Sequence, residues 1–93
     1  MRIIGKFNVP ISDEWHRHES GPVLYVGLQA PLDLNYWAEI DTEAEIPWRW
    51  LRVFGTGQPL PDNAQYVGTV QDVAHSLVWH LYERIEGKYE NLH

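Results

Sequence analysis

The chain has 93 residues, a hydrophobic fraction of 44% and a formal net charge of −6, which together predict one folded domain with a small core. It contains no cysteine, so disulfide bonds and thiolate-bound metals are excluded. The excess of acidic residues argues against a nucleic-acid-binding protein, because affinity for nucleic acid depends on neutralising phosphates with lysine and arginine.

Alternating apolar and polar residues between turn signals predict β-strands from the start of the chain. The first strand covers residues 2–9, and residues 15–19 form a short second strand. Residues 23–29 are a near-continuous apolar run of β-forming residues, which predicts a central strand. Residues 34–40 alternate again, so we expect the two segments to form a hairpin.

The second half of the chain begins with the acidic residues 41–45, which predict a solvated loop. Strands over residues 48–54 and 65–70 follow, and residues 71–76 are predicted to be a loop. Residues 77–83 fit two structures, because their apolar spacing suits a helix whereas their β-branched and aromatic side chains suit a strand. The strand is favoured, since every earlier segment is strand-like.

Seven short strands separated by glycine and proline turns predict an all-β domain over residues 1–83, with a polar tail over residues 84–93. The expected fold is a mostly antiparallel β-sandwich or small barrel. An open sandwich leaves unpaired strand edges, so we also expect a homo-oligomer.

A glycine- and proline-rich segment follows the strand over residues 48–54. Gly55 and Gly57 permit backbone angles closed to other residues, and Pro59 and Pro61 stiffen the exit. We therefore predict a structural turn in which one of the two glycines has a positive φ. A phosphate-binding loop is disfavoured, because the prolines remove N–H donors that such a loop presents.

Strand 48–54 also carries the most ambiguous residues of the chain. Trp48, Trp50 and Arg52 share one face, and Arg49 lies on the other. If the tryptophans point inward they are core residues. If they point outward they resemble an interaction surface, which is rich in tryptophan, tyrosine and arginine, or a platform for a planar ligand. The candidate binding residues are Trp48, Arg49, Trp50, Arg52, Gln58 and His80.

The last predicted strand, over residues 77–83, carries one tryptophan and one histidine that should point to opposite faces. Trp79 and His80 occupy opposite faces, since neighbouring residues of a strand point in opposite directions. Trp79 shares its face with Leu77 and Leu81, so we place it in the core. His80 then lies on the other face with Tyr82.

Catalytic and metal-binding patterns are weak. His16 and His18 share a strand face, but zinc needs a third ligand, which His75 or His80 would have to supply. Solvated histidines are the preferred interpretation. There is no nucleophile elbow, and a domain of this size leaves little room for a carboxylate pair across a cleft. We therefore predict no catalytic residue, metal or cofactor, and a protein that is not an enzyme.

Six segments of the chain carry distinctive patterns: Val9-Pro-Ile-Ser-Asp-Glu-Trp-His16, Leu24-Tyr-Val-Gly27, Trp37-Ala38, Arg52-Val-Phe-Gly-Thr-Gly-Gln-Pro-Leu-Pro61, Tyr66-Val-Gly-Thr69 and Leu77-Val-Trp-His-Leu81. Together they resemble a family of small uncharacterised proteins found mostly in bacteriophages, often of actinobacterial hosts, and in bacterial genomes with prophages. The Phe-Gly-Thr-Gly-x-Pro-[Leu/Ile]-Pro and Trp-His-Leu signatures are the most specific parts. The resemblance implies a phage or prophage setting, and it brings no established activity.

These observations favour a non-enzymatic phage accessory protein that binds a host protein and antagonises host function or defence. One alternative is a small-ligand-binding module that sequesters a nucleotide signal, and another is a virion-associated decoration protein. A ligand-sequestering module should have a deep pocket lined by tryptophan and arginine, whereas a protein antagonist should expose an apolar patch on the order of several hundred Å². With no membrane-spanning run and no signal peptide, we expect the protein in the host cytoplasm.

Overall fold

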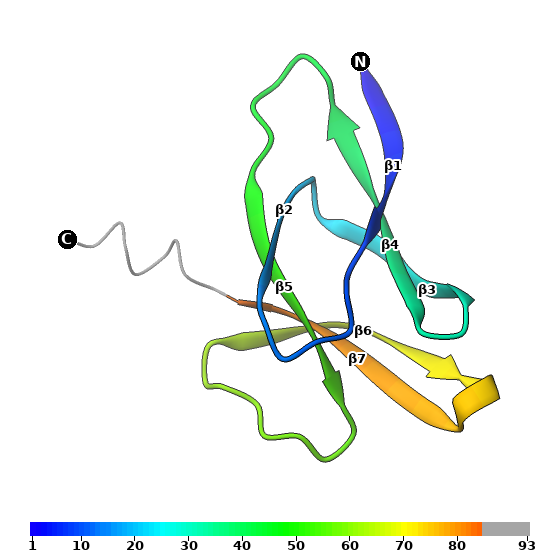
Figure 1. Ribbon diagram of the computed structural model, residues 1–93. Coiled ribbons are helices and arrows are strands. Elements are labelled where there is room, and N and C mark those ends of the chain that lie inside the picture. Colours follow the sequence, from blue (N-terminus) through cyan, green and yellow to red (C-terminus); the bar gives the residue numbers. More distant parts are fainter. Residues whose placement is uncertain (85–93) are drawn as a thin grey trace.

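The computed structural model describes residues 1–84, which form seven β-strands and one 3₁₀ turn (Figure 1). The strands are β1 (Arg2–Asn8), β2 (His16–Glu19), β3 (Val23–Ala30), β4 (Asp33–Asp41), β5 (Trp48–Gly55), β6 (Ala64–Asp72) and β7 (Leu77–Arg84), with the turn η1 (Val73–His75) before β7. All pairings are antiparallel. The predicted tail over residues 84–93 lies outside the described residues, except for Arg84, which ends β7.

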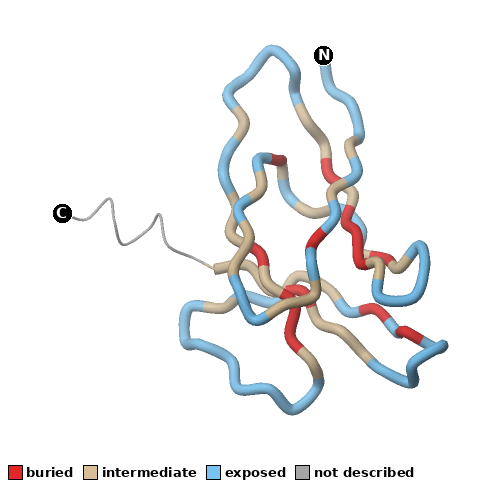
Figure 2. Tube along the Cα trace, viewed as in Figure 1, coloured by how far each residue is buried: buried red, intermediate tan, exposed pale blue. Residues whose placement is uncertain are grey.

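The strands form two sheets that pack as a β-sandwich. One sheet has the order β1-β4-β3 and the other the order β2-β5-β7-β6. Because side chains alternate along each strand, one face of each sheet supplies the core. Buried stretches therefore gather on β4 and β5, whereas the loops that follow these two strands are mostly exposed (Figure 2). The buried core residues are Val9, Leu34, Tyr36, Ala38, Leu51, Val53, Val70 and Leu81.

The core also contains a pair of buried hydroxyl groups that are hydrogen-bonded to each other. Tyr36 is fully buried, and its phenol oxygen lies 3.0 Å from Oγ of Ser20, which is itself buried. Burial raises the pKa of Tyr36. A buried hydroxyl with a partner avoids the cost of an unmet hydrogen bond, so tyrosine is tolerated at the centre of β4.

The all-β prediction is confirmed, but the position of one strand is not. Residues 23–29 were expected to form a central strand, whereas β3 is an edge strand and β4 is the centre of its sheet. The apolar run serves two purposes. Leu24 and Tyr25 are exposed beside an irregularity in the pairing, while Val26 lies against Gly68 of β6 and closes the junction between the sheets.

The end of the chain resolves the choice between helix and strand. Residues 77–84 form β7, which pairs with β5 on one side and β6 on the other, so the helical alternative is wrong. The expected loop over residues 71–76 is shorter than predicted. β6 continues to Asp72, and η1 then reverses the chain.

The turn after β5 has the expected backbone. Gly57 has a φ of 94°, whereas Gly55 does not enter the positive region. The side chain of Gln58 accepts a hydrogen bond from the backbone N–H of Gly55 at 2.6 Å, so it braces the turn.

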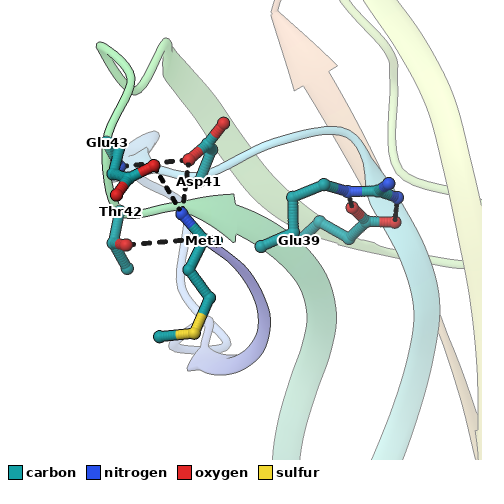
Figure 3. A network of polar contacts seen from close by, with 6 residues as sticks. Met1, Glu39, Asp41, Thr42 and Glu43 are labelled. Atoms are coloured by element: carbon teal, nitrogen blue, oxygen red, sulfur yellow. Dashed lines mark hydrogen bonds and ion pairs between the residues drawn. The ribbon is translucent and has the colours of Figure 1, made fainter.

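The opposite end of the molecule holds a polar network that joins β1 to β4 (Figure 3). The amino group of Met1 lies 3.3 Å from Oδ1 of Asp41 and 3.2 Å from Oε2 of Glu43. Arg2 donates two hydrogen bonds to Glu39, at 2.6 and 2.9 Å, and thereby lowers the pKa of that carboxyl group. These contacts hold the start of the acidic loop in place. Within residues 1–84, no helix is long and apolar enough to cross a membrane.

Candidate interaction face

The two faces of β5 differ in chemistry, and the structure decides which one is the core. Leu51 and Val53 point inward and are buried. Trp48, Trp50 and Arg52 therefore point outward, and Trp48 is 60% exposed. The interpretation of these tryptophans as core residues is wrong, because Arg49, Leu51 and Val53 occupy the inward positions of β5.

Strand pairing extends this outer surface across the sheet. On β2, Arg17 is opposite Trp50, and on β7, Tyr82 is opposite Arg52. Tyr66 of β6 is opposite Tyr82 in turn. We call this surface the arginine–aromatic face, which comprises Arg17, Trp48, Trp50, Arg52, Phe54, Tyr66, His80, Tyr82 and Arg84, with Trp15 at its margin.

Each arginine of this face lies against an aromatic ring. The Cζ atom of Arg17 is 3.6 Å from the ring centre of Trp48, and that of Arg52 is 4.3 Å from Phe54. Cζ of Arg84 lies 4.8 Å from Trp50. All three distances are within the range of a cation–π interaction. The guanidinium groups are therefore held in place before any partner arrives.

A row of aromatic rings crosses the same face. Trp15 and Phe54 meet edge to face at 6.0 Å, Phe54 and Tyr82 at 5.5 Å, and Tyr82 and Tyr66 at 5.7 Å. Phe54 is buried beneath its neighbours, whereas Tyr66 is 57% exposed. The outer face thus has a small packed cluster of its own, which fixes the positions of its exposed rings.

Arg52 differs from Arg17 in its lower exposure, although the nearest carboxylate is distant from both guanidinium groups. Its side chain is only 18% exposed, and its closest carboxylate is Asp13, whose Oδ1 lies 3.8 Å from Nη2. The Nε atom of Arg52 is buried and has no acceptor within residues 1–84. This side chain is thus a nearly buried cation with a distant counter-charge.

His80 lies at the edge of the face in a chain of hydroxyl groups. Its Nε2 is 2.9 Å from Oγ1 of Thr56, and its Nδ1 is 3.1 Å from Oγ1 of Thr69. The hydroxyl of Tyr66 lies 2.7 Å from that same Thr69 oxygen. These contacts orient the imidazole through both nitrogens, so it is a fixed polar group beside the aromatic row.

Two of the predicted binding residues lie elsewhere. Arg49 points into the sandwich, where Nη1 lies 2.8 Å from Oε2 of Glu83 and Nε donates to the carbonyl oxygens of Ser20 and Gly21. It therefore ties β5 to β7 and to the connection between β2 and β3, and it does not belong to the face. Gln58 braces the turn after β5, close to His80 but beside the face.

The predicted directions of Trp79 and His80 on β7 are confirmed. Trp79 points inward and packs against the core, although it is only partly buried. His80 points outward beside Phe54, as its pairing position requires.

The residues of the face that the sequence did not reveal lie outside β5. Trp15 comes just before β2, and the others come from other strands: Arg17, Tyr66, Tyr82 and Arg84. Alternation along each of these strands divides its residues into two faces. It does not tell which of the two faces lies on the same side of the sheet as Trp48. Strand order and register decide this, and neither is written in local sequence patterns. The clustering of arginine with tryptophan and tyrosine was the only local signal.

The charge of this face contrasts with that of the whole chain. The chain has five arginines, at positions 2, 17, 49, 52 and 84, and three of them lie on the arginine–aromatic face. Among residues 1–84, the acids within ion-pair distance of Arg17 and Arg52 are Glu19, 3.9 Å from Arg17, and Asp13, and both are exposed. A protein with a net charge of −6 thus presents cations together with aromatic rings on one surface.

A cleft of about 660 Å³ opens at one end of the sandwich, beside this face. Its walls include Ile11, Val53, Gly55 and Trp79, and no arginine lines it. The histidines of β2 are occupied by local contacts, since His16 lies 2.8 Å from Oγ of Ser12 and His18 lies 2.9 Å from the carbonyl oxygen of Asn8. Among residues 1–84, no three potential ligands are grouped to hold a metal ion.

Fold and face together define a small two-sheet β-sandwich with an ordered arginine–aromatic surface. The chain belongs to the family described as Domain of unknown function (DUF7352), whose model matches residues 1–91. Comparison with curated proteins and with solved structures finds no match.

Proposed function

We propose that this protein is a non-enzymatic binding protein whose arginine–aromatic face contacts a protein partner. The observation that carries the proposal is the set of three arginines, each held against an aromatic ring, on one outer face of a sheet. Tryptophan, tyrosine and arginine dominate the binding energy of protein interfaces. Side chains that are already ordered also lose less entropy when a partner binds.

The cleft at the end of the sandwich supports the small-ligand alternative less well. A module that sequesters a nucleotide signal needs cations in its pocket to meet the phosphate charge. The cleft has Trp79 and apolar walls but no arginine in its lining. The cations lie instead on an open surface, which suits a macromolecular partner.

The biological setting of the proposal comes from the resemblance of the sequence to phage and prophage proteins. We propose that the partner is a protein of the bacterial host, that binding occurs in the host cytoplasm, and that it antagonises a host function or defence. The setting determines which lysate is used in a capture experiment, namely that of an actinobacterial host.

Capture with matched variants tests the role of the face. Trp48 lies on the arginine–aromatic face and Tyr25 on the other sheet, and the two are similarly exposed, at 60% and 66%. Immobilised wild-type protein and the Tyr25→Ser variant should retain the same host protein, whereas the Trp48→Ser variant should lose it. Full retention of the host protein by the Trp48→Ser variant would contradict the proposal, and its loss by Tyr25→Ser would place the binding surface on the other sheet.

Self-association is a separate proposal. β1 is an edge strand, and its Ile4 is 68% exposed. Unpaired edges tend to associate with other strands, so we expect a homo-oligomer. The chain has a mass of 10.9 kDa, and sedimentation of a species of that mass at micromolar concentration would contradict this expectation.

A further inference from the structure

The arginine–aromatic face carries a specific indication of the chemistry of its partner. We propose that the partner presents an acidic segment, and that one of its carboxylates binds Arg52 in place of Asp13. This inference rests on the proposed function of the face and adds two things to it: the charge of the partner and the residue that receives it.

Arg52 has the geometry of an incomplete ion pair. The separation of 3.8 Å between its Nη2 and Asp13 exceeds the 2.7–2.9 Å that is typical of a charge-assisted hydrogen bond. Its buried Nε has no acceptor within residues 1–84. Because Nε is enclosed, an external carboxylate would reach the Nη end of the guanidinium, whose one carboxylate contact within residues 1–84 is the long one to Asp13.

Other arginines of the chain show what a complete pair looks like. Arg2 donates to both carboxylate oxygens of Glu39, at 2.6 and 2.9 Å. Nη1 of Arg49 lies 3.1 and 2.8 Å from the two oxygens of Glu83. Arg52 makes no hydrogen bond of this kind within the described part of the chain, although it is as little exposed as Arg49.

Asp13 is placed to be exchanged for another carboxylate. It lies in the irregular segment between β1 and β2, and its side chain is 89% exposed. Its contact with Arg52 is too long to hold it firmly, and water already surrounds it. A partner carboxylate that reached hydrogen-bonding distance would displace it at little cost.

The surroundings of Arg52 favour a protein segment over a nucleic acid. Its neighbours across the face are Tyr82 and, beyond it, the exposed Tyr66, which would pack against apolar or aromatic side chains beside the incoming carboxylate. The face contains no lysine, and its guanidinium groups already cover rings that bases would need for stacking. The net charge of −6 also opposes a polymer of phosphates.

The test uses a defined acidic probe, a labelled random copolymer of glutamate and tyrosine, with binding followed by fluorescence anisotropy. Arg52→Gln should weaken binding about tenfold, because a charged hydrogen-bond donor is lost. Arg52→Lys should recover part of the affinity, since it keeps the charge but not the planar fork. Asp13→Asn should tighten binding by about two- to fivefold, because the competing carboxylate is neutralised. The control Arg2→Gln, on the other sheet, should bind as the wild type does.

Several results would overturn the inference. Equal binding by Arg52→Gln and Arg2→Gln would remove Arg52 from the site, and equal binding of polylysine would remove the preference for acids. Binding of an oligothymidylate that depends on Arg52 would assign the face to nucleic acid. Circular dichroism spectra that match the wild type establish that the variants are folded.

The copolymer experiment and the capture experiment with Trp48→Ser distinguish a wrong partner charge from a wrong function of the face. If Trp48→Ser loses the host protein but Arg52 has no effect on the copolymer, the face binds protein and the acidic partner is wrong. If the copolymer depends on Arg52 but capture is unaffected by Trp48→Ser, the proposed function of the face is wrong.

Discussion

Arg17 and Trp48 lie on neighbouring strands with the guanidinium carbon of one 3.6 Å from the ring centre of the other. Their pairing positions are offset by two residues and are therefore diagonal neighbours on one face, since Arg17 is opposite Trp50 and Trp48 is opposite Glu19. The arginine therefore reaches along the sheet to cover the most exposed ring of the face. This contact keeps an exposed tryptophan in one orientation.

The Arg17–Trp48 contact should contribute a measurable coupling energy. Arg17→Ala and Trp48→Ala, made singly and together, should give a coupling of about 0.5–1 kcal/mol in urea unfolding, as expected for an exposed cation–π pair. Additive effects of the two substitutions would show that the contact contributes nothing to stability.

The two neighbours Trp79 and His80 should differ strongly in their effect on stability. Trp79→Ala removes a large ring that packs against the core, and should lower the free energy of unfolding by about 3 kcal/mol, the lower end of the usual range because the ring is partly buried. His80→Ala leaves the core intact and should cost about 1 kcal/mol for its lost hydrogen bonds. Chemical denaturation of both variants measures the difference, and equal losses would contradict the assignment of the two faces.

The turn after β5 offers a clean test of backbone conformation. A Cβ atom at Gly57 would meet nothing within 4 Å, yet the φ of 94° is unfavourable for any other residue. Gly57→Ala should therefore destabilise the protein by about 1 kcal/mol or more through backbone strain alone. Gly55→Ala is the matched control, since its Cβ would make only ordinary contacts at 3.6 Å and its φ is not positive. A Gly57→Ala variant as stable as the control would show that this backbone angle is not required.

Asp72 should make the free energy of unfolding depend on pH in the acidic range. It is 3% exposed and accepts hydrogen bonds from the backbone N–H groups of Leu32 and His75, so it links the β3–β4 turn to the start of η1. Burial disfavours the charged form of this carboxylate, but the bonds from His75 and Leu32 outweigh it and lower the pKa.

Because the folded-state pKa of Asp72 lies below the unfolded value of about 3.9, its stabilisation is complete well above that value and is lost as pH falls through the folded pKa. The urea midpoint of the wild type should therefore decrease between about pH 5 and pH 2. Asp72→Asn should be less stable at pH 7 and lose less on acidification, whereas substitution of the exposed Asp62 should leave the profile unchanged. A profile that is identical in Asp72→Asn and wild type would refute this role.

Local patterns predicted the strands well, because period-two alternation and the glycine and proline turns are local features. They also predicted the opposite directions of Trp79 and His80. They did not predict that β4 is the central strand of its sheet, since an apolar run such as residues 23–29 suits a junction between sheets as well as a central position.

The candidate face was found only in part, for a related reason. Trp48, Trp50 and Arg52 lie together on the outer side of the sheet, as alternation along one strand predicts, and their role in binding stays a prediction. Arg49 was included although alternation turns it to the other side, where it pairs with Glu83. Arg17 and Arg84 were missed, because only the pairing of β2 and β7 with β5 brings them to Trp50.

The affinity of the captured partner for purified variants tests the central claim most directly. Isothermal titration calorimetry of wild type, Trp48→Ser and Tyr25→Ser should show a loss of about 30-fold or more for Trp48→Ser, as for a hot-spot tryptophan, and an unchanged dissociation constant for Tyr25→Ser. Unchanged affinity of Trp48→Ser together with a loss in Tyr25→Ser would place the binding surface on the three-stranded sheet and contradict the account.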